Sequence, residues 1–139
     1  MTPSAVPNDL RALIASGPLA HLTTLNADGS PQVSVIWIGL DGDDIVSGHL
    51  GRRVKISNIE RDPRVVLSFT APQDRTTFLN PYAVVQAHAR VEPSEQAWDL
   101  LDRLMKVYLS PDADFPAPRA PGFIIRYQVD RISGVGPWA

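Results

Sequence analysis

The sequence predicts a mainly β domain in which six antiparallel strands close into a small β-barrel with peripheral helices. Six segments have the residue pattern of strands, and short turns join the first three, which indicates antiparallel pairing. A chain of 139 residues suits one core, so we expect residues 1–139 to form a single domain. Closure is expected because an open six-stranded sheet would leave two exposed edges.

The N-terminal third predicts a short helix followed by a meander of three strands. Residues 9–17 form an amphipathic helix that Asn8 caps and that Gly17 and Pro18 end. Strands are expected at residues 19–25, 31–40 and 44–48, with turns at 26–30 and 41–43. The second half of the strand 31–40 is apolar on both faces, so we expect it to be buried on both sides.

The remainder of the chain predicts three more strands and two helices. A helix over residues 52–61 ends at Asp62-Pro63, and a long helix starts at Ser94, its expected cap, and runs to about Tyr108. The expected strands are 64–70, 82–91 and 122–132, and the expected loops are 71–81, 110–121 and the tail 133–139.

Composition excludes several classes of protein. There is no cysteine, which excludes disulfides, zinc-thiolate sites, iron–sulfur clusters and a cysteine nucleophile. The three histidines show no ligand spacing, so no metal is expected. Residues 1–8 lack the features of a signal peptide, and no apolar run is long enough to span a bilayer. We therefore expect a cytoplasmic protein with no membrane contact, and the net charge of −2 predicts no nucleic-acid partner.

The charge is unevenly distributed along the chain. Residues 52–64 carry five basic and two acidic side chains, a local charge of +3 that leaves −5 for the rest. Cations beside the free N–H groups of a helix start can bind phosphate, although a solvated charged helix gives the same pattern. Arg53 and Lys55 would point apart on a regular helix, but both can reach one anionic chain if Arg53 is extended.

Three motifs in order resemble the split-barrel flavin-binding family of the pyridoxamine 5′-phosphate oxidases. They are the turn Asp28-Gly29-Ser30-Pro31-Gln32, the basic pair Arg53-Val54-Lys55, and the helix end Arg61-Asp62-Pro63-Arg64-Val65. Within that family, the sequence is most similar to the small actinobacterial oxidoreductases that use the deazaflavin coenzyme F420. The resemblance runs from Leu10 to about Ile132 and implies an FMN-binding-like split barrel. It also implies a homodimer with the cofactor at the subunit interface.

The resemblance also implies which residues bind the cofactor. Arg53 and Lys55 match the residues that hold the cofactor phosphate, and Arg52 would extend this cationic rim. Five residues match the strand that passes the ring of the cofactor: Gln32, Ser34, Val35, Ile36 and Trp37. Ser47 and Gly48 match the strand end near the phosphate. Many FMN-binding members have Ser-Arg-Lys where this chain has Arg53-Val54-Lys55, which favours F420 over FMN. Tyr127, Trp138 and Trp98 are candidate aromatics of the pocket or interface, although packing of the long helix is favoured for Trp98.

The implied function is an F420-dependent oxidoreductase. The reduced deazaflavin would give a hydride to a small conjugated organic substrate, so the cofactor carries the redox chemistry and no catalytic residue is identified. Two alternatives remain open. One is an FMN-dependent oxidoreductase like the pyridoxamine 5′-phosphate oxidases, and the other is a non-catalytic protein that binds flavin or F420.

Overall fold

The structure is a computed structural model that describes residues 6–139, so the prediction about a signal peptide in residues 1–8 falls largely outside it. Within this range the elements follow in the order α1 (Asn8–Ala15), β1 (Ala20–Leu25), β2 (Pro31–Ile36), β3 (Gly39–Asp41), β4 (Asp44–His49), α2 (Val54–Arg61), β5 (Arg64–Thr70), β6 (Tyr82–Ser94), α3 (Ala97–Tyr108) and β7 (Gly122–Val135). None of these helices is long and apolar enough to cross a membrane.

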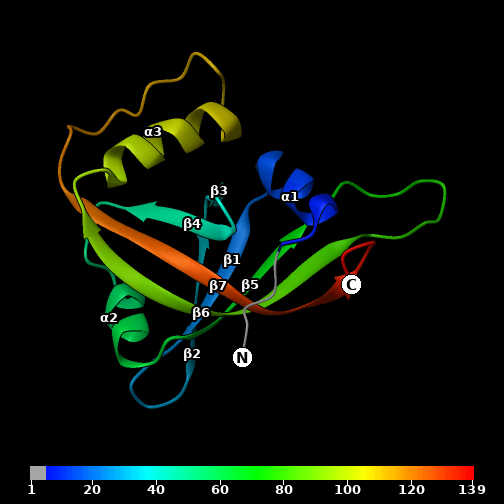
Figure 1. Cartoon of the computed structure of the whole chain (residues 1–139), viewed down its shortest axis with the longest axis horizontal. Helices are drawn as coiled ribbons and strands as arrows, with labels where there is room; N and C mark the ends of the chain where they lie inside the picture. Colours follow the sequence, from blue (N-terminus) through cyan, green and yellow to red (C-terminus); the bar gives the residue numbers. More distant parts are fainter. Residues whose placement is uncertain (1–5) are drawn as a thin grey trace.

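The described strands form one antiparallel sheet in the order β2-β1-β5-β6-β7-β4-β3. The two outermost strands, β2 and β3, are the halves of the predicted strand 31–40, so that prediction of one strand was wrong and the sheet has seven strands. Because Trp37 and Ile38 join its two edges covalently, the sheet curls round on itself (Figure 1). The barrel is therefore closed by the covalent link between β2 and β3, which are not paired with each other in the described sheet. We call this place the seam.

The split at this seam has a local cause. The backbone N–H of Ile38 donates a hydrogen bond to the hydroxyl of Tyr108 at 2.9 Å instead of to a neighbouring strand. The same hydroxyl donates to the Pro18 carbonyl at 2.6 Å. Tyr108 is the last residue of α3, so this helix occupies the place where a strand partner would lie.

The barrel holds the main core, and a smaller core lies outside it. The largest buried side chains of the interior come from the strands and from α1 and α2: Leu10, Ile14, Leu22, Ile56, Leu67, Phe69, Ile125 and Tyr127. Helix α3 covers the outer face of β4, where Leu100 and Leu104 pack with Val46 (Figure 1). Both sides of β4 are thus buried, as its run of buried residues from Ile45 to Gly48 shows.

Several predicted boundaries were wrong by a few residues, and partner strands explain the largest shift. Strand β6 continues to Ser94 because residues 92–94 pair with residues 122–124 of β7, so α3 begins at Ala97 and Ser94 does not cap it. For the same reason β7 extends to Val135, which pairs with Tyr82. At the other helices, Asn8 is the first residue of α1, not its cap, and α2 begins at Val54.

Candidate functional site

An open groove of about 240 Å³ lies where β2, the end of β4 and α2 meet α3. Its lining residues are Leu19, Val35, Ile36, Trp37, Gly48, His49, Lys55 and Leu101. Five residues that the sequence analysis selected therefore lie along one groove: Val35, Ile36, Trp37, Gly48 and Lys55. The groove has apolar walls with a cation at its α2 end, which suits a ligand with a flat apolar part and an anionic part.

Lys55 is the cation in this groove. It is half-buried, and its Nζ donates a hydrogen bond to the Ser34 hydroxyl at 3.3 Å. Burial lowers the pKa of Lys55, and the nearby charge of Arg53 lowers it further. Within residues 6–139 no carboxylate pairs with its ammonium group, so a bound anion would relieve both effects.

The other basic residues of the segment 52–64 differ in how far they are already paired. Three of them are held by neighbours: Arg52 by Glu60 at 2.8 Å, Arg61 by the Leu25 carbonyl at 2.8 Å, and Arg64 by Asp62 at 2.7 Å. Arg53 is exposed and extended at the N-terminus of α2, and its side chain has no such partner among the described residues. Arg53 and Lys55 therefore remain as the cations of this segment that are available to a ligand.

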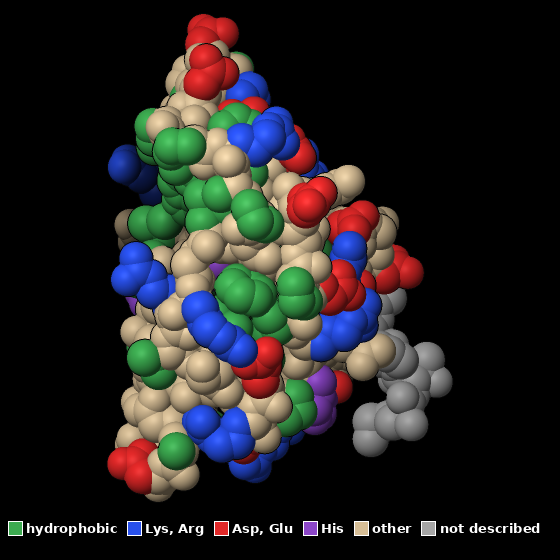
Figure 2. Space-filling model, turned by 90° about the vertical axis from the view of Figure 1, so that its left-hand side faces the viewer, with side chains coloured by type: hydrophobic (Ala, Val, Ile, Leu, Met, Phe, Trp, Pro, Cys, Tyr) green, Lys and Arg blue, Asp and Glu red, His purple; other side chains and the backbone are tan. Residues whose placement is uncertain are grey.

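Figure 2 shows the side of the molecule that carries α2 and the loop before β7. Hydrophobic side chains gather there between basic and acidic ones. The guanidinium of Arg52 lies 5.8 Å from the centre of the Phe123 ring and is also paired with Glu60.

A buried polar network that sequence reasoning missed positions α2 against the β1–β2 hairpin. The side-chain amide of Asn58 donates to Thr24 Oγ1 at 3.0 Å and to Asn26 Oδ1 at 2.9 Å, and its own oxygen accepts from Arg61 at 2.8 Å. All of its hydrogen-bonding capacity on nitrogen is used, so the helix has one defined position on the hairpin. That position sets the distance between Lys55 and β2.

Trp37 forms one wall of the groove and is held from behind by α3. Its ring stacks on Tyr108 with 5.4 Å between centroids and 18° between planes. Because Tyr108 is itself bound to the backbone at Pro18 and Ile38, the indole has little freedom to turn. An aromatic wall of this kind suits a flat conjugated ligand.

Three of the residues selected from the sequence shape the surroundings of the groove. Ser47 is completely buried, and its hydroxyl is bonded inside the barrel to Tyr127 at 2.8 Å. Gly48 lets α3 approach, since a Cβ there would lie 3.1 Å from the Ala97 carbonyl oxygen. Gln32 accepts a hydrogen bond from Thr24 at 2.8 Å, which ties it to the network around Asn58.

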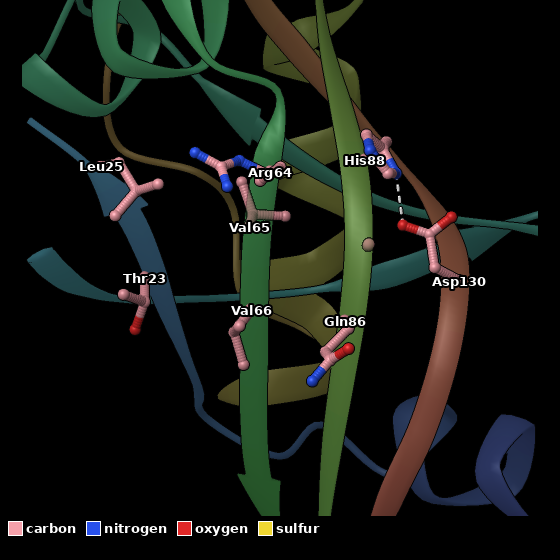
Figure 3. Close-up of a pocket in the computed structure, with 9 residues that line it drawn as sticks. Thr23, Leu25, Arg64, Val65, Val66, Gln86, His88 and Asp130 are labelled. Carbon is pink, nitrogen blue, oxygen red and sulfur yellow. Dashed lines mark hydrogen bonds and ion pairs between the residues drawn. The ribbon is translucent and has the colours of Figure 1, made fainter. Parts of the chain in front are cut away.

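A second groove of about 310 Å³ lies on the outer face of the sheet and is shown in Figure 3. It crosses β1, β5, β6 and β7 and is lined by Thr23, Leu25, Arg64, Val65, Val66, Gln86, Ala87, His88 and Asp130. A bulge in β7 opposite Gln86 and Ala87 directs Asp130 to His88, and the two side chains are joined by a hydrogen bond. No group of three or more histidine and acidic side chains within residues 6–139 could hold a metal ion.

The candidate aromatics Tyr127 and Trp138 lie in different surroundings. Tyr127 is fully buried in the barrel core, so its assignment to a pocket or interface was wrong. Trp138 packs beside Gly136, and its indole N–H donates to the Tyr82 carbonyl at 2.9 Å, which fixes the C-terminal tail on β6.

Comparison with known proteins gives one family and several similar structures. Residues 6–136 match the family described as pyridoxamine 5′-phosphate oxidase. A comparison with curated proteins finds no match. Among solved structures, the chain is similar to an F420 reductase, with 27% identity and a TM-score of 0.75 over 92% of this chain and 98% of that one.

Two further solved structures show the fold alone. One is a conserved hypothetical protein from Mycobacterium tuberculosis, with 17% identity and a TM-score of 0.75 over 95% of this chain and 85% of that one. The other is a heme binding protein from Mycobacterium smegmatis, with 20% identity and a TM-score of 0.64 over 98% of this chain and 55% of that one. Together with the family match, these similarities confirm the predicted split-barrel architecture.

Proposed function

The chain belongs to the pyridoxamine 5′-phosphate oxidase family, and from that premise we propose that it is an oxidoreductase that binds coenzyme F420. The bound cofactor, when reduced, would supply a hydride to a small conjugated organic substrate. The observation that carries the proposal is the groove itself, in which Lys55, without a carboxylate partner within residues 6–139, lies at one end of the aromatic and apolar wall of Trp37 and Val35. The similarity to an F420 reductase at 27% identity supports F420 over other flavin-type cofactors.

The residues of the groove fit the two chemical parts of such a cofactor. Arg53 and Lys55 would bind the phosphate, with Arg52 at the rim of the same cationic segment. The ring would lie against Val35, Ile36 and Trp37, while Ser34 keeps the Lys55 ammonium directed toward β2. Gln32, Ser47 and Gly48 would act by holding these walls in place. The contribution of the protein is thus to bind and orient the cofactor and to exclude water.

A second copy of the chain would complete this site. Val33 and Val35 lie on one face of β2, Leu19 immediately precedes β1, and each of the three side chains is 55% or 56% exposed. Such a cluster of exposed aliphatic side chains beside an open groove favours a partner surface. The proposal predicts a homodimer by sedimentation and weaker dimerisation in Val33→Glu, whose charge would be buried at the interface. A monomeric wild-type protein would exclude a shared site.

Titration of the purified apo-protein with F420 and FMN, followed by fluorescence, tests the choice of cofactor. We expect saturable binding of F420 that is tighter than that of FMN. Tighter binding of FMN would support the alternative of an FMN-dependent oxidoreductase of the same family. Tight F420 binding without turnover of a panel of enones and imines would support a non-catalytic binding protein.

A further inference from the structure

A chain of hydrogen bonds runs from the centre of the barrel to the groove. The Tyr127 hydroxyl on β7 lies 2.8 Å from Ser47 Oγ on β4, and this oxygen lies 2.7 Å from Nε2 of His49. Tyr127 and Ser47 are completely buried, whereas His49 is at the end of β4 and lines the groove next to Lys55. The chain therefore connects a closed interior to a surface that a ligand can reach.

The hydrogens of this chain can run along it in two directions, because if Ser47 accepted from both neighbours its own buried hydrogen would have no acceptor among the partners found within residues 6–139. In one, His49 Nε2–H donates to Ser47, and Ser47 donates to Tyr127. The phenol hydrogen would then have no acceptor, because Ser47 is the hydrogen-bond partner found for the Tyr127 hydroxyl within residues 6–139. A buried O–H without an acceptor carries a large free-energy cost. The other direction, from Tyr127 to Ser47 and from Ser47 to His49 Nε2, leaves no hydrogen without an acceptor.

This direction determines the tautomer of His49. If Nε2 accepts a hydrogen bond, the proton of a neutral imidazole is on Nδ1. The ring is neutral because its burial, and then the charge of Lys55, lower the pKa of His49 to about 3. Nδ1 has no hydrogen-bond partner in the described part of the chain. The groove thus contains a neutral N–H donor beside an ammonium group.

We infer that His49 is a ligand-binding residue whose Nδ1–H donates to a phosphate oxygen of the cofactor, next to Lys55. The inference rests on the proposed function for the identity of the ligand. Ser47 is a positioning residue, because its hydroxyl donates to Nε2 and so keeps the proton on the nitrogen that remains for the ligand, while Tyr127 donates to Ser47 from the barrel core. A fixed neutral donor adds a directed hydrogen bond without adding repulsion to the charges of Lys55 and Arg53.

The tautomer is measured on the apo-protein by long-range ¹H–¹⁵N NMR of the histidine rings. We expect His49 to be protonated on Nδ1 and not on Nε2 from pH 5 to pH 8. Ser47→Ala removes the hydroxyl that donates to Nε2, so the Nε2–H form should then appear, whereas Tyr127→Phe leaves this donor in place and should keep the Nδ1–H form. A predominant Nε2–H tautomer in the wild-type protein, or an unchanged tautomer in Ser47→Ala, would overturn the assignment. This measurement does not depend on which cofactor binds.

The ligand contact is measured by binding of F420 and of its deazaflavin chromophore without phosphate. His49→Phe should weaken F420 binding about tenfold and leave the chromophore unaffected, and His49→Asn, which keeps an N–H donor, should restore part of the loss. Equal F420 binding by the wild type and His49→Phe, or equal losses for both ligands, would overturn the contact. If the folded wild-type protein binds no F420, the proposed function fails, while the tautomer result still stands.

Discussion

Replacement of Lys55 by alanine is the sharpest test of the proposed phosphate site. The Lys55 ammonium has one hydrogen bond, to Ser34, and is half-buried, so a phosphate there would be paired in partly desolvated surroundings. Opposite unit charges 4 Å apart attract by about 4 kcal/mol at an effective dielectric constant near 20. The cost of desolvating the ligand reduces this, and hydrogen bonds to charged groups contribute a net of about 1.5–3 kcal/mol.

At about 1.4 kcal/mol per factor of ten, Lys55→Ala should raise the Kd for F420 by about 10- to 100-fold in a fluorescence titration at low salt. Arg64→Ala is the matched control, since it removes the same charge from the same segment, but this guanidinium is paired with Asp62. We expect less than about a threefold change for the control. A Kd within about twofold of the wild type in Lys55→Ala, or equal losses in both variants, would refute the assignment.

Three further predictions concern stability and are measured by urea denaturation. Asn58→Ala should lower the free energy of unfolding by about 1–3 kcal/mol, because the buried hydroxyl of Thr24 then has no group that donates to it. A change below about 0.5 kcal/mol would contradict a structural role for this network. Phe69→Ala removes a core side chain and should lower the free energy of unfolding by about 3–5 kcal/mol. Phe78 is 85% exposed, so Phe78→Ala should change the free energy of unfolding by less than about 0.5 kcal/mol. Similar losses in the two variants would show that Phe69 is not in the core. The lowered pKa of His49 means that below about pH 6.5 the unfolded chain binds a proton that the folded chain does not bind until about pH 3. Stability should therefore fall as the pH drops from 6.5 to 4, by at most about 1.4 kcal/mol per pH unit, and His49→Gln should flatten this dependence; an equally steep curve in His49→Gln would show that other groups cause it.

Local patterns predicted most of the fold. Alternating apolar residues located the strands, and the order of Gly51, the basic residues and Asp62-Pro63 located α2 within two residues of its start. The pair Arg53 and Lys55 was also accessible from sequence, because both follow a strand end and begin a helix. These features depend on neighbours within a few positions along the chain.

The features that the sequence did not reveal depend on distant partners. The strand 31–40 is interrupted because Tyr108, 70 residues after Ile38, takes its N–H. Strand β6 extends to Ser94, the predicted helix cap, because β7 pairs with it there. The family resemblance placed Ser47 near the phosphate, but β4 is buried on both faces and the Ser47 hydroxyl is bonded inside the barrel to a residue 80 positions later. Spacing also could not show that Glu60 and Asp62 would pair with Arg52 and Arg64.

The seam between β2 and β3 also has a consequence for motion. Elsewhere the wall is a continuous ladder of backbone hydrogen bonds, but at Ile38 it depends on one hydroxyl at the end of α3. Local unfolding of the last turn of this helix would free the Ile38 amide and the indole of Trp37 together, without opening the rest of the sheet. The wall of the groove thus belongs to the same cooperative unit as α3, so fraying of this helix controls ligand access. In the sequence, α3 comes after six of the seven strands.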